Sequence, residues 1–256
     1  MELKQFIRSL LIAFSTYSRI PVPRVDWSDG NRKYAMCFFP LVGAAVGGAL
    51  WLWLSLSERL SFGPLLRGAV AAVIPLIVTG GIHMDGFMDT LDALVSRKPK
   101  EEKLRVLKDS RSGAFAVMGC ASYLLLTAAL LSEARAVDAP TLFPVYVVSR
   151  SMSALTMTAL PSARPGGMLD GFSHAAETRT VRAFCVAYLL LCFAAWLRSG
   201  ILTALLCAAV AAAAVLGYRR MALREFGGAT GDLAGWFLEV AEICLTAAAL
   251  TGGRIG

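Results

Sequence analysis

The chain has 256 residues, and its composition is that of a membrane protein. Apolar residues make up 57% of it and charged residues 17%, and the mean hydropathy is +0.62. This excludes a disordered chain, which combines low hydrophobicity with high net charge. The formal charge of +7 falls mainly between long apolar blocks. We therefore predict an all-α polytopic membrane bundle that forms a single domain over residues 1–256.

Residues 1–20 are predicted to form an amphipathic helix that lies along the membrane surface. Lys4, Arg8 and Arg19 are interleaved with apolar residues. No small-residue cleavage site follows, so the segment does not match a signal peptide. A basic face opposite an apolar one is typical of a helix that rests on anionic lipid.

Seven apolar stretches are predicted to cross the bilayer, because each approaches the roughly 20 residues that a span needs. They cover residues 38–57, 65–81, 114–132, 140–160, 181–197, 201–217 and 234–252. Three of them are near the short limit, so a count between six and eight fits the sequence. The chain shows no internal repeat, which argues against the repeated halves of many transporters.

The distribution of basic residues predicts the orientation of these spans. With the N-terminus in the cytoplasm, 18 of the 25 Lys and Arg residues fall in cytoplasmic segments and five on the other side. Positive charge in short loops stays in the cytoplasm. The longer loops, 82–113 and 161–180 among them, are therefore predicted to face the cytoplasm.

The sharpest motif is TGGIHMDGFMDTLD at residues 79–92, where the second span ends. Asp85, Asp89 and Asp92 are spaced i, i+4, i+7, which places three carboxylates on one stripe of a helix. Like charges so placed repel one another. A divalent cation relieves the repulsion, and oxygen ligands favour Mg²⁺ or Mn²⁺. The alternative is a solvated acidic face at a helix end.

The same motif carries glycines and one of the two histidines. Gly80, Gly81 and Gly86 are expected to let the backbone approach a bulky anionic ligand. For His83 three roles remain open: a general base, a hydrogen-bond donor to phosphate, or a packing residue at the interface.

Two further loop motifs are candidates for binding phosphate. KDSRSG (108–113) offers Lys108 and Arg111, with Asp109 as a further metal ligand, unless the cluster merely anchors the next helix. GGATGD (227–232) is a glycine-rich turn before a helix, which suits an anion, although Asp232 is alternatively a helix cap.

The ionisable residues Arg150, Glu239 and Glu242 lie inside the predicted membrane region. Charged groups at that depth need a partner or a polar cavity. The two glutamates are one helical turn apart, and both an ion pair with Arg150 and a ligand contact remain open. The tract SARPGG (162–167) adds Arg164 on the side predicted to be cytoplasmic.

Taken together, these segments resemble the cobalamin synthase family, the adenosylcobinamide-GDP ribazoletransferases. The resemblance covers nearly the whole chain. It rests on FSTYSRIPVP (14–23), FFPLVGAAVGG (38–48), GGIHMDGFMDTLDAL (80–94), KDSRSGAFAVMG (108–119), SRS (149–151) with PSARPGG (161–167), and GGATGD (227–232). Ala93 stands where the family pattern has glycine.

The resemblance implies a membrane enzyme of late vitamin B12 assembly. It would transfer the phosphocobinamide moiety of adenosylcobinamide-GDP to α-ribazole, or to α-ribazole 5′-phosphate, with release of GMP and a requirement for Mg²⁺. The expected setting is the bacterial cytoplasmic (inner) membrane, with the active site facing the cytoplasm. The lipid bilayer is a partner and nucleic acid is not, and assembly into a homo-oligomer is left open.

Site roles follow from the resemblance residue by residue. The catalytic set is Asp85, Asp89, Asp92 and His83, and the metal ligands are Asp85, Asp89, Asp92 and Asp109. The residues expected to bind substrate or phosphate are Lys108, Arg111, Arg150, Arg164, Gly227, Gly228, Thr230 and Asp232. This division suits phosphoryl transfer, which depends on charge neutralisation and positioning.

Two other classes of function stay open. One is a different Mg²⁺-dependent membrane transferase, of the CDP-alcohol phosphotransferase or prenyltransferase type, although Asp89-Thr90 and His83-Met84 depart from those patterns. The other is a cation transporter that uses Asp85, Asp89 and the two glutamates. A transporter would place its acids near mid-membrane, whereas the sharpest acids here lie beside basic loops.

Overall fold

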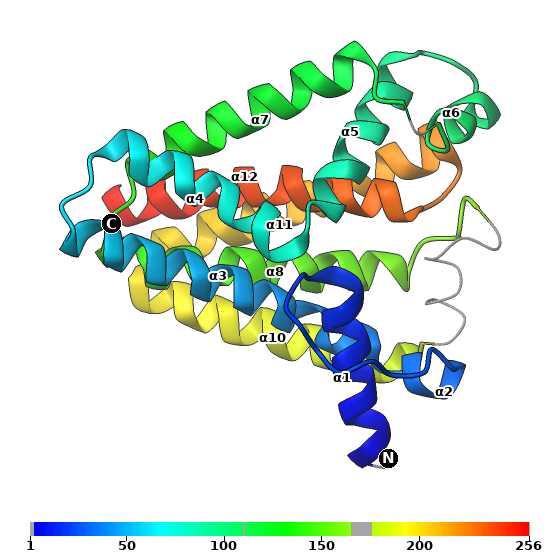
Figure 1. Ribbon diagram of the computed structural model, residues 1–256, viewed down its shortest axis with the longest axis horizontal. Helices are drawn as coiled ribbons and strands as arrows, with labels where there is room; N and C mark the ends of the chain where they lie inside the picture. Colours follow the sequence, from blue (N-terminus) through cyan, green and yellow to red (C-terminus); the bar gives the residue numbers. More distant parts are fainter. Residues whose placement is uncertain (1–2, 110, 165–175, 256) are drawn as a thin grey trace.

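The computed structural model describes residues 3–109, 111–164 and 176–255, and the regular elements in these ranges are helices (Figure 1). One isolated β-bridge joins Ser162 to Ala229. The predicted all-α architecture is confirmed.

A helix lies at each of the seven predicted spans. These are α3 (Ala35–Arg59), α4 (Pro64–Thr79), α7 (Ala114–Ser132), α8 (Ala139–Met157), α10 (Thr178–Ser199), α11 (Ile201–Met221) and α12 (Gly231–Ile255). Five helices of the described chain, α3, α7, α10, α11 with its continuation η2 (Ala222–Phe226), and α12, are long and apolar enough to cross a membrane. A sixth crossing results if α4 and the following α5 (Ile82–Val95) form one bent span. The chain is therefore a polytopic membrane protein.

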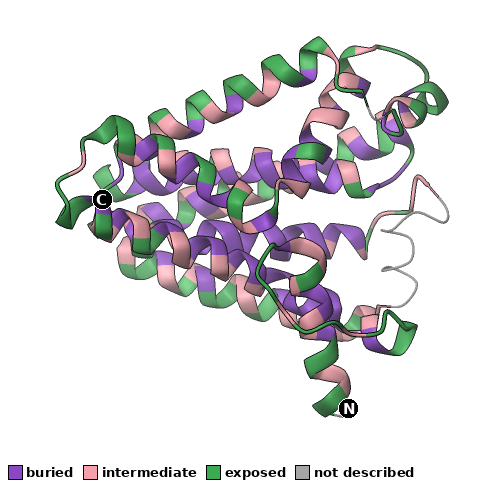
Figure 2. Cartoon of the chain, in the orientation of Figure 1, coloured by how far each residue is buried: buried purple, intermediate pink, exposed green. Residues whose placement is uncertain are grey.

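Helix α8 is too polar to count among the five apolar helices. It lies inside the bundle. It packs against α3, α10 and α12, and most of its residues are buried (Figure 2). Ser149 and Arg150 contact Glu242 of α12, and the side chains of Ser151 and Ser153 are also buried.

The outer surface of the bundle is apolar, as a bilayer requires. Leu125 and Leu126 of α7, Leu190 and Leu191 of α10, and Leu216 of α11 are each more than half exposed. Lipid tails provide the solvent for side chains of this kind.

The connections between helices gather at two opposite ends of the bundle (Figure 1). One end holds α5, α6 (Lys100–Val106) and η2, together with the short helix α2 (Asp29–Arg32). The other end holds residues 60–63 and 133–138 and the C-terminus. The loops predicted to share one side of the membrane thus share one end of the structure.

Two glycines turn the chain between α4 and α5. Gly80 and Gly81 have φ angles of 70° and 78°, a left-handed conformation that glycine adopts without steric cost. The two helices consequently meet at 99°, and α5 packs across α7 and α12. The sequence suggested a ligand as the reason for these glycines, but the turn itself requires them.

The first helix, α1 (Leu3–Tyr17), confirms the predicted N-terminal helix. It buries Ile12 and Ala13 against the start of α3, while Leu3 and Ile7 remain exposed. The Arg19 amide, just beyond α1, donates a hydrogen bond of 2.8 Å to the carbonyl oxygen of Val78. The end of α1 is thereby held beside the end of α4. The position of α1 on the membrane surface stays a prediction.

Candidate active site

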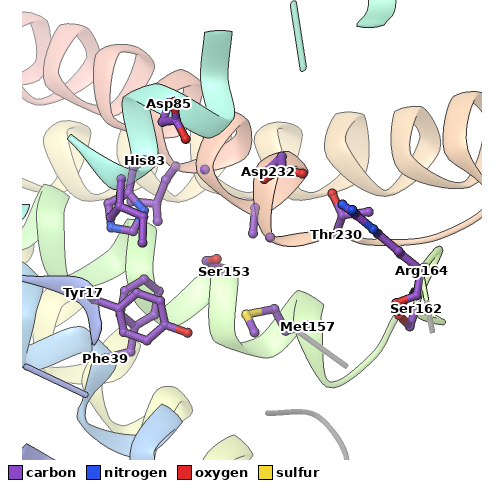
Figure 3. Close-up of a pocket in the computed structure, with 15 residues that line it drawn as sticks. Tyr17, Phe39, His83, Asp85, Ser153, Met157, Ser162, Arg164, Thr230 and Asp232 are labelled. Carbon is purple, nitrogen blue, oxygen red and sulfur yellow. Dashed lines mark hydrogen bonds between the residues drawn. The ribbon is translucent and has the colours of Figure 1, made fainter. Parts of the chain in front are cut away.

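A cavity of about 360 Å³ opens where α1, α3, α5, α8 and α12 meet (Figure 3). Its volume lies within the range of small-ligand sites, about 300–1,000 Å³. The described residues that line it are Tyr17, Phe39, Ile82, His83, Asp85, Ser153, Met157, Ser162, Arg164, Thr230, Gly231, Asp232, Ala234, Gly235 and Leu238. Five of the residues predicted from the sequence are among them: His83, Asp85, Arg164, Thr230 and Asp232.

Two glycines let α5 and α12 cross in backbone contact. A Cβ atom added to Gly86 would lie 2.7 Å from the carbonyl oxygen of Asp232. One added to Gly235 would lie 2.7 Å from the carbonyl oxygen of His83. Gly86 thus serves helix packing, where the sequence suggested approach to a ligand. The crossing brings the acidic stripe of α5 to the start of α12.

The acidic group at this crossing consists of Asp85, Asp89 and Asp232. The Asp89 carboxylate is repelled by those of Asp85 and Asp232. Within the described ranges no ion pair joins any of the three to a basic side chain. Arg164 attracts Asp232 from a greater distance. Asp232 is thus part of the acidic group, and the phosphate contact predicted for it from the sequence stays a prediction.

The chemistry of this group fits Mg²⁺. Its donors are carboxylate oxygens, which Mg²⁺ prefers, and within the described ranges only the distant Arg164 offsets part of their mutual repulsion. No three His, Cys, Asp or Glu side chains in the described chain already converge as a metal site. Mg²⁺ does not require such a cage, because it commonly uses one or two carboxylates together with substrate phosphates.

The third aspartate of the stripe, Asp92, caps a helix. Its Oδ2 accepts a hydrogen bond of 2.5 Å from the Gly113 amide, and its Oδ1 accepts one of 2.9 Å from the Ala116 amide. Both amides belong to the N-terminal turn of α7, where a negative charge is favoured. A Cβ atom at Gly113 would lie 2.7 Å from both carboxylate oxygens, so glycine is required there. The metal role predicted for Asp92 is untested, and the cap already occupies both oxygens.

The KDSRSG motif reaches this region through Gly113, but its charged residues do not line the cavity. The Arg111 side chain donates hydrogen bonds of 3.0 and 2.8 Å to the two carboxylate oxygens of Asp109. These bonds lower the pKa of Asp109 to about 2. Asp109 is thus already paired, which weakens its assignment as a metal ligand. Lys108 is exposed, and Ser110 lies outside the described residues.

Inside the bundle, Arg150 forms an ion pair with Glu242. Its Nη1 lies 2.6 Å from Oε1 of Glu242, and the Arg150 side chain is 1% exposed. The Ser149 hydroxyl donates a further hydrogen bond of 2.9 Å to the same oxygen. A buried guanidinium needs a counter-charge, and Glu242 provides it. The ion pair that the sequence left open for Arg150 is present, and the phosphate contact stays a prediction.

The GGATGD turn pairs with the SAR segment through backbone hydrogen bonds. The Ala163 amide donates to the carbonyl oxygen of Ala229 (2.9 Å), and the Ala229 amide donates to that of Pro161 (2.8 Å). A Cβ atom at Gly228 would lie 2.3 Å from the Pro161 carbonyl oxygen, which explains the glycine. This pairing positions Arg164 at the cavity. Residues 165–167 of the predicted SARPGG tract lie outside the described residues.

The four residues predicted from the turn itself take different places. Gly227 has a φ angle of 80° and shapes the turn. Gly227 and Gly228 are not among the described residues that line the cavity. Both instead allow the backbone conformation and close packing of the turn. Thr230 and Asp232 do line the cavity. The Leu233 amide donates a hydrogen bond of 3.2 Å to the Thr230 hydroxyl, so Thr230, and not Asp232, caps α12.

His83 faces the opposite side of α5 from Asp85 (Figure 3). Its side chain is buried among Tyr17 and Phe39, with ring centroids 6.3 and 5.7 Å away. Its Nε2 atom has no hydrogen-bond partner in the described part of the chain. The packing places His83 away from the acidic group, and the role of general base stays a prediction.

The ten other described residues that line the cavity carry no charge and were not predicted as site residues; Tyr17, Phe39, Ser153 and Met157 are among them. Tyr17 and Phe39 belong to the FSTYSR and FFPL segments that contributed to the resemblance. An aromatic residue beside an apolar block has the same residue type as many core residues. The sequence therefore does not distinguish the two, and only the tertiary structure shows that Tyr17 and Phe39 line the cavity.

Comparison with known proteins agrees with the site. The family model described as cobalamin-5-phosphate synthase matches residues 9–250. Several relatives carry the name adenosylcobinamide-GDP ribazoletransferase. The protein from Lachnoclostridium phytofermentans is 39% identical, covering 93% of this chain and 92% of its own. That from Desulfitobacterium hafniense is 36% identical (93% and 94%), and that from Halalkalibacterium halodurans is 33% identical (95% of each).

No solved structure matches the chain. The family match covers both the acidic group of α5 and the GGATGD turn that meets it, and the relatives match along almost their full length. By this evidence the chain belongs to the cobalamin-5-phosphate synthase family.

Proposed function

We propose that this chain is an Mg²⁺-dependent transferase of the nucleotide-loop step of cobalamin biosynthesis. It transfers the phosphocobinamide moiety of adenosylcobinamide-GDP to α-ribazole or its 5′-phosphate, and GMP leaves. The observation that carries the proposal is one cavity shared by two carboxylates that form no ion pair with the described residues, Asp85 and Asp232, and a basic side chain, Arg164. The names of the relatives support the choice of substrates.

The reaction forms one P–O bond and breaks another. A ribose hydroxyl of the nucleoside attacks the phosphorus next to the corrinoid, and the bond from that phosphorus to GMP breaks. Asp85 is exposed in the cavity and free of basic partners among the described residues, so it is placed to accept the hydroxyl proton. Arg164 is placed to hold phosphate oxygens through its planar guanidinium.

Asp85, Asp89 and Asp232 are the residues that would hold Mg²⁺. When bound, the ion neutralises charge on the phosphates. Without it, three carboxylates would oppose the approach of an anionic substrate, and among the described residues that line the cavity Arg164 is the one cation against them. The requirement for a divalent cation follows from this imbalance.

A cation transporter is the weaker alternative. It would use acids at mid-membrane, and the two candidates there are engaged: Glu242 pairs with Arg150, and Tyr123 hydrogen-bonds to Glu239. Acids already bound to protein partners do not offer a path for an ion. A flux assay in proteoliposomes checks this directly.

The deciding experiment is incubation of the purified protein with adenosylcobinamide-GDP, α-ribazole and Mg²⁺, followed by detection of GMP and of the cobalamin product. Both products are expected, and both should disappear when EDTA removes the metal. A parallel reaction with α-ribazole 5′-phosphate identifies the preferred acceptor. Absence of both products with either acceptor, in Mg²⁺ and in Mn²⁺, would overturn the proposal.

A further inference from the structure

One side of the cavity is formed by three rings from distant parts of the chain: Tyr17 of α1, Phe39 of α3 and His83 of α5, here called the aromatic wall. The Tyr17 and Phe39 rings lie 4.4 Å apart between centroids. The Tyr17 and His83 rings are nearly parallel, with an interplanar angle of 17°. Met157 and Leu238 also line the cavity and belong to the same hydrophobic cluster as Phe39.

The cavity is polar on the other side. Ser162, Arg164 and Thr230 lie opposite the aromatic wall, and Asp85 and Asp232 lie between the two sides (Figure 3). A ligand that fits this division has a flat apolar group at one end and an anionic or hydroxyl-bearing group at the other. A nucleoside that reacts at its ribose is such a ligand.

The aromatic wall carries one unused polar atom. His83 is 6% exposed, and its Nε2 has no partner in the described chain. Buried polar atoms in folded proteins nearly always have hydrogen-bond partners. The ring lines the cavity, so its unpartnered nitrogen is a candidate for one hydrogen bond to a ligand atom.

We infer that the aromatic wall binds the base of the ribazole nucleoside, an assignment that rests on the proposed function. Its base is a benzimidazole, which has one free ring nitrogen and otherwise apolar edges. Tyr17 and Phe39 contact its faces and edge, and His83, with the proton on Nε2, donates a hydrogen bond to that nitrogen. The ribose then extends toward Asp85 and Arg164, where the reacting phosphate binds.

The chemistry of the wall disfavours the guanine of the second substrate. Guanine presents a carbonyl oxygen, a ring N–H and an amino group along one edge, and each needs a partner when buried. In the described wall the one buried polar side-chain atom without a partner is Nε2 of His83. We therefore place the guanine outside this subsite.

Calorimetric titration of the purified protein with α-ribazole alone tests the inference without the transfer reaction. Tyr17→Leu and Phe39→Leu should each raise the dissociation constant at least about fivefold, the lower end of the cost of losing a base–aromatic contact. Tyr17→Phe, which keeps the ring, should leave it unchanged. Binding of GDP should not change in any of these variants, and thermal unfolding reports whether each is folded.

The hydrogen bond from His83 has its own test. Ribosylindole, in which a C–H group replaces the free ring nitrogen, should bind the wild type several-fold more weakly than α-ribazole. With His83→Phe, which keeps a ring but removes the nitrogen, the two nucleosides should bind equally.

The outcomes separate this inference from the proposed function. Failure of the wild type to bind α-ribazole, or unchanged binding in the folded Tyr17→Leu and Phe39→Leu variants, overturns the subsite even if GMP is released. If the variants bind GDP more weakly and bind α-ribazole as the wild type does, the wall binds guanine, and the inference is likewise overturned. Loss of α-ribazole binding in these variants supports the subsite even if no GMP forms, and the transfer reaction alone then fails.

Discussion

The Arg150–Glu242 pair offers the sharpest test of what the bundle interior does. Glu242→Gln keeps the size of the side chain and removes its charge, which leaves the guanidinium unpaired at 1% exposure. Breaking a buried pair in this way costs about 3–5 kcal/mol. For a chain of this size that lowers the melting temperature by about 10 °C.

The exposed pair between Arg254 and Glu133 is the matched control. Its side chains are 53% and 64% exposed, so Glu133→Gln should cost about 1 kcal/mol or less. Thermal unfolding in one detergent compares the two variants directly. If the melting temperature falls no further for Glu242→Gln than for Glu133→Gln, the buried pair does not stabilise the protein and the assignment is refuted.

A double variant separates stability from substrate binding. Arg150→Met with Glu242→Gln removes both charges, and apolar replacement of a buried pair is often neutral or stabilising. The double variant should regain most of the lost stability and retain GMP release. If it regains stability but its KM for adenosylcobinamide-GDP rises strongly, Arg150 contacts the substrate and the structural interpretation is wrong.

Three further predictions concern the site and its surroundings. Asp85→Asn should lower GMP release at least about hundredfold, because a metal ligand and the proton acceptor are lost together. Near-normal turnover at limiting Mg²⁺ would contradict this. The melting temperature should not change. Gly113→Ala should destabilise the protein by about 1–3 kcal/mol, since its Cβ atom would meet the Asp92 carboxylate, whereas Gly217→Ala, with open space around it, should be neutral in the same unfolding assay. In a background without the six native cysteines, Lys98→Cys should resist a membrane-impermeant thiol reagent in intact cells and Val137→Cys should react; the reverse pattern would invert the proposed topology.

The sequence alone determined the positions of the helices and the presence of an acidic motif. Apolar blocks of nearly bilayer length predicted all seven long helices, because burial in lipid depends on composition within one segment. The spacing of Asp85 and Asp89 predicted their shared face, because helical periodicity is local. Basic residues predicted which loops share an end, and the structure groups those loops together (Figure 1).

Only the tertiary structure decided the partners of these residues. Asp232 joins Asp85 and Asp89 although it lies more than 140 positions later, and Arg150 is paired with Glu242 from another helix. The cap that Asp92 provides to α7 depends on a close approach at Gly113. Such contacts depend on how helices cross, and the crossings are set by small residues such as Gly86 and Gly235. Periodicity within one segment carries no information about the distance to another segment. The sequence therefore does not show that Asp92 caps a helix while Asp85 stays exposed in the cavity, and only the folded chain does.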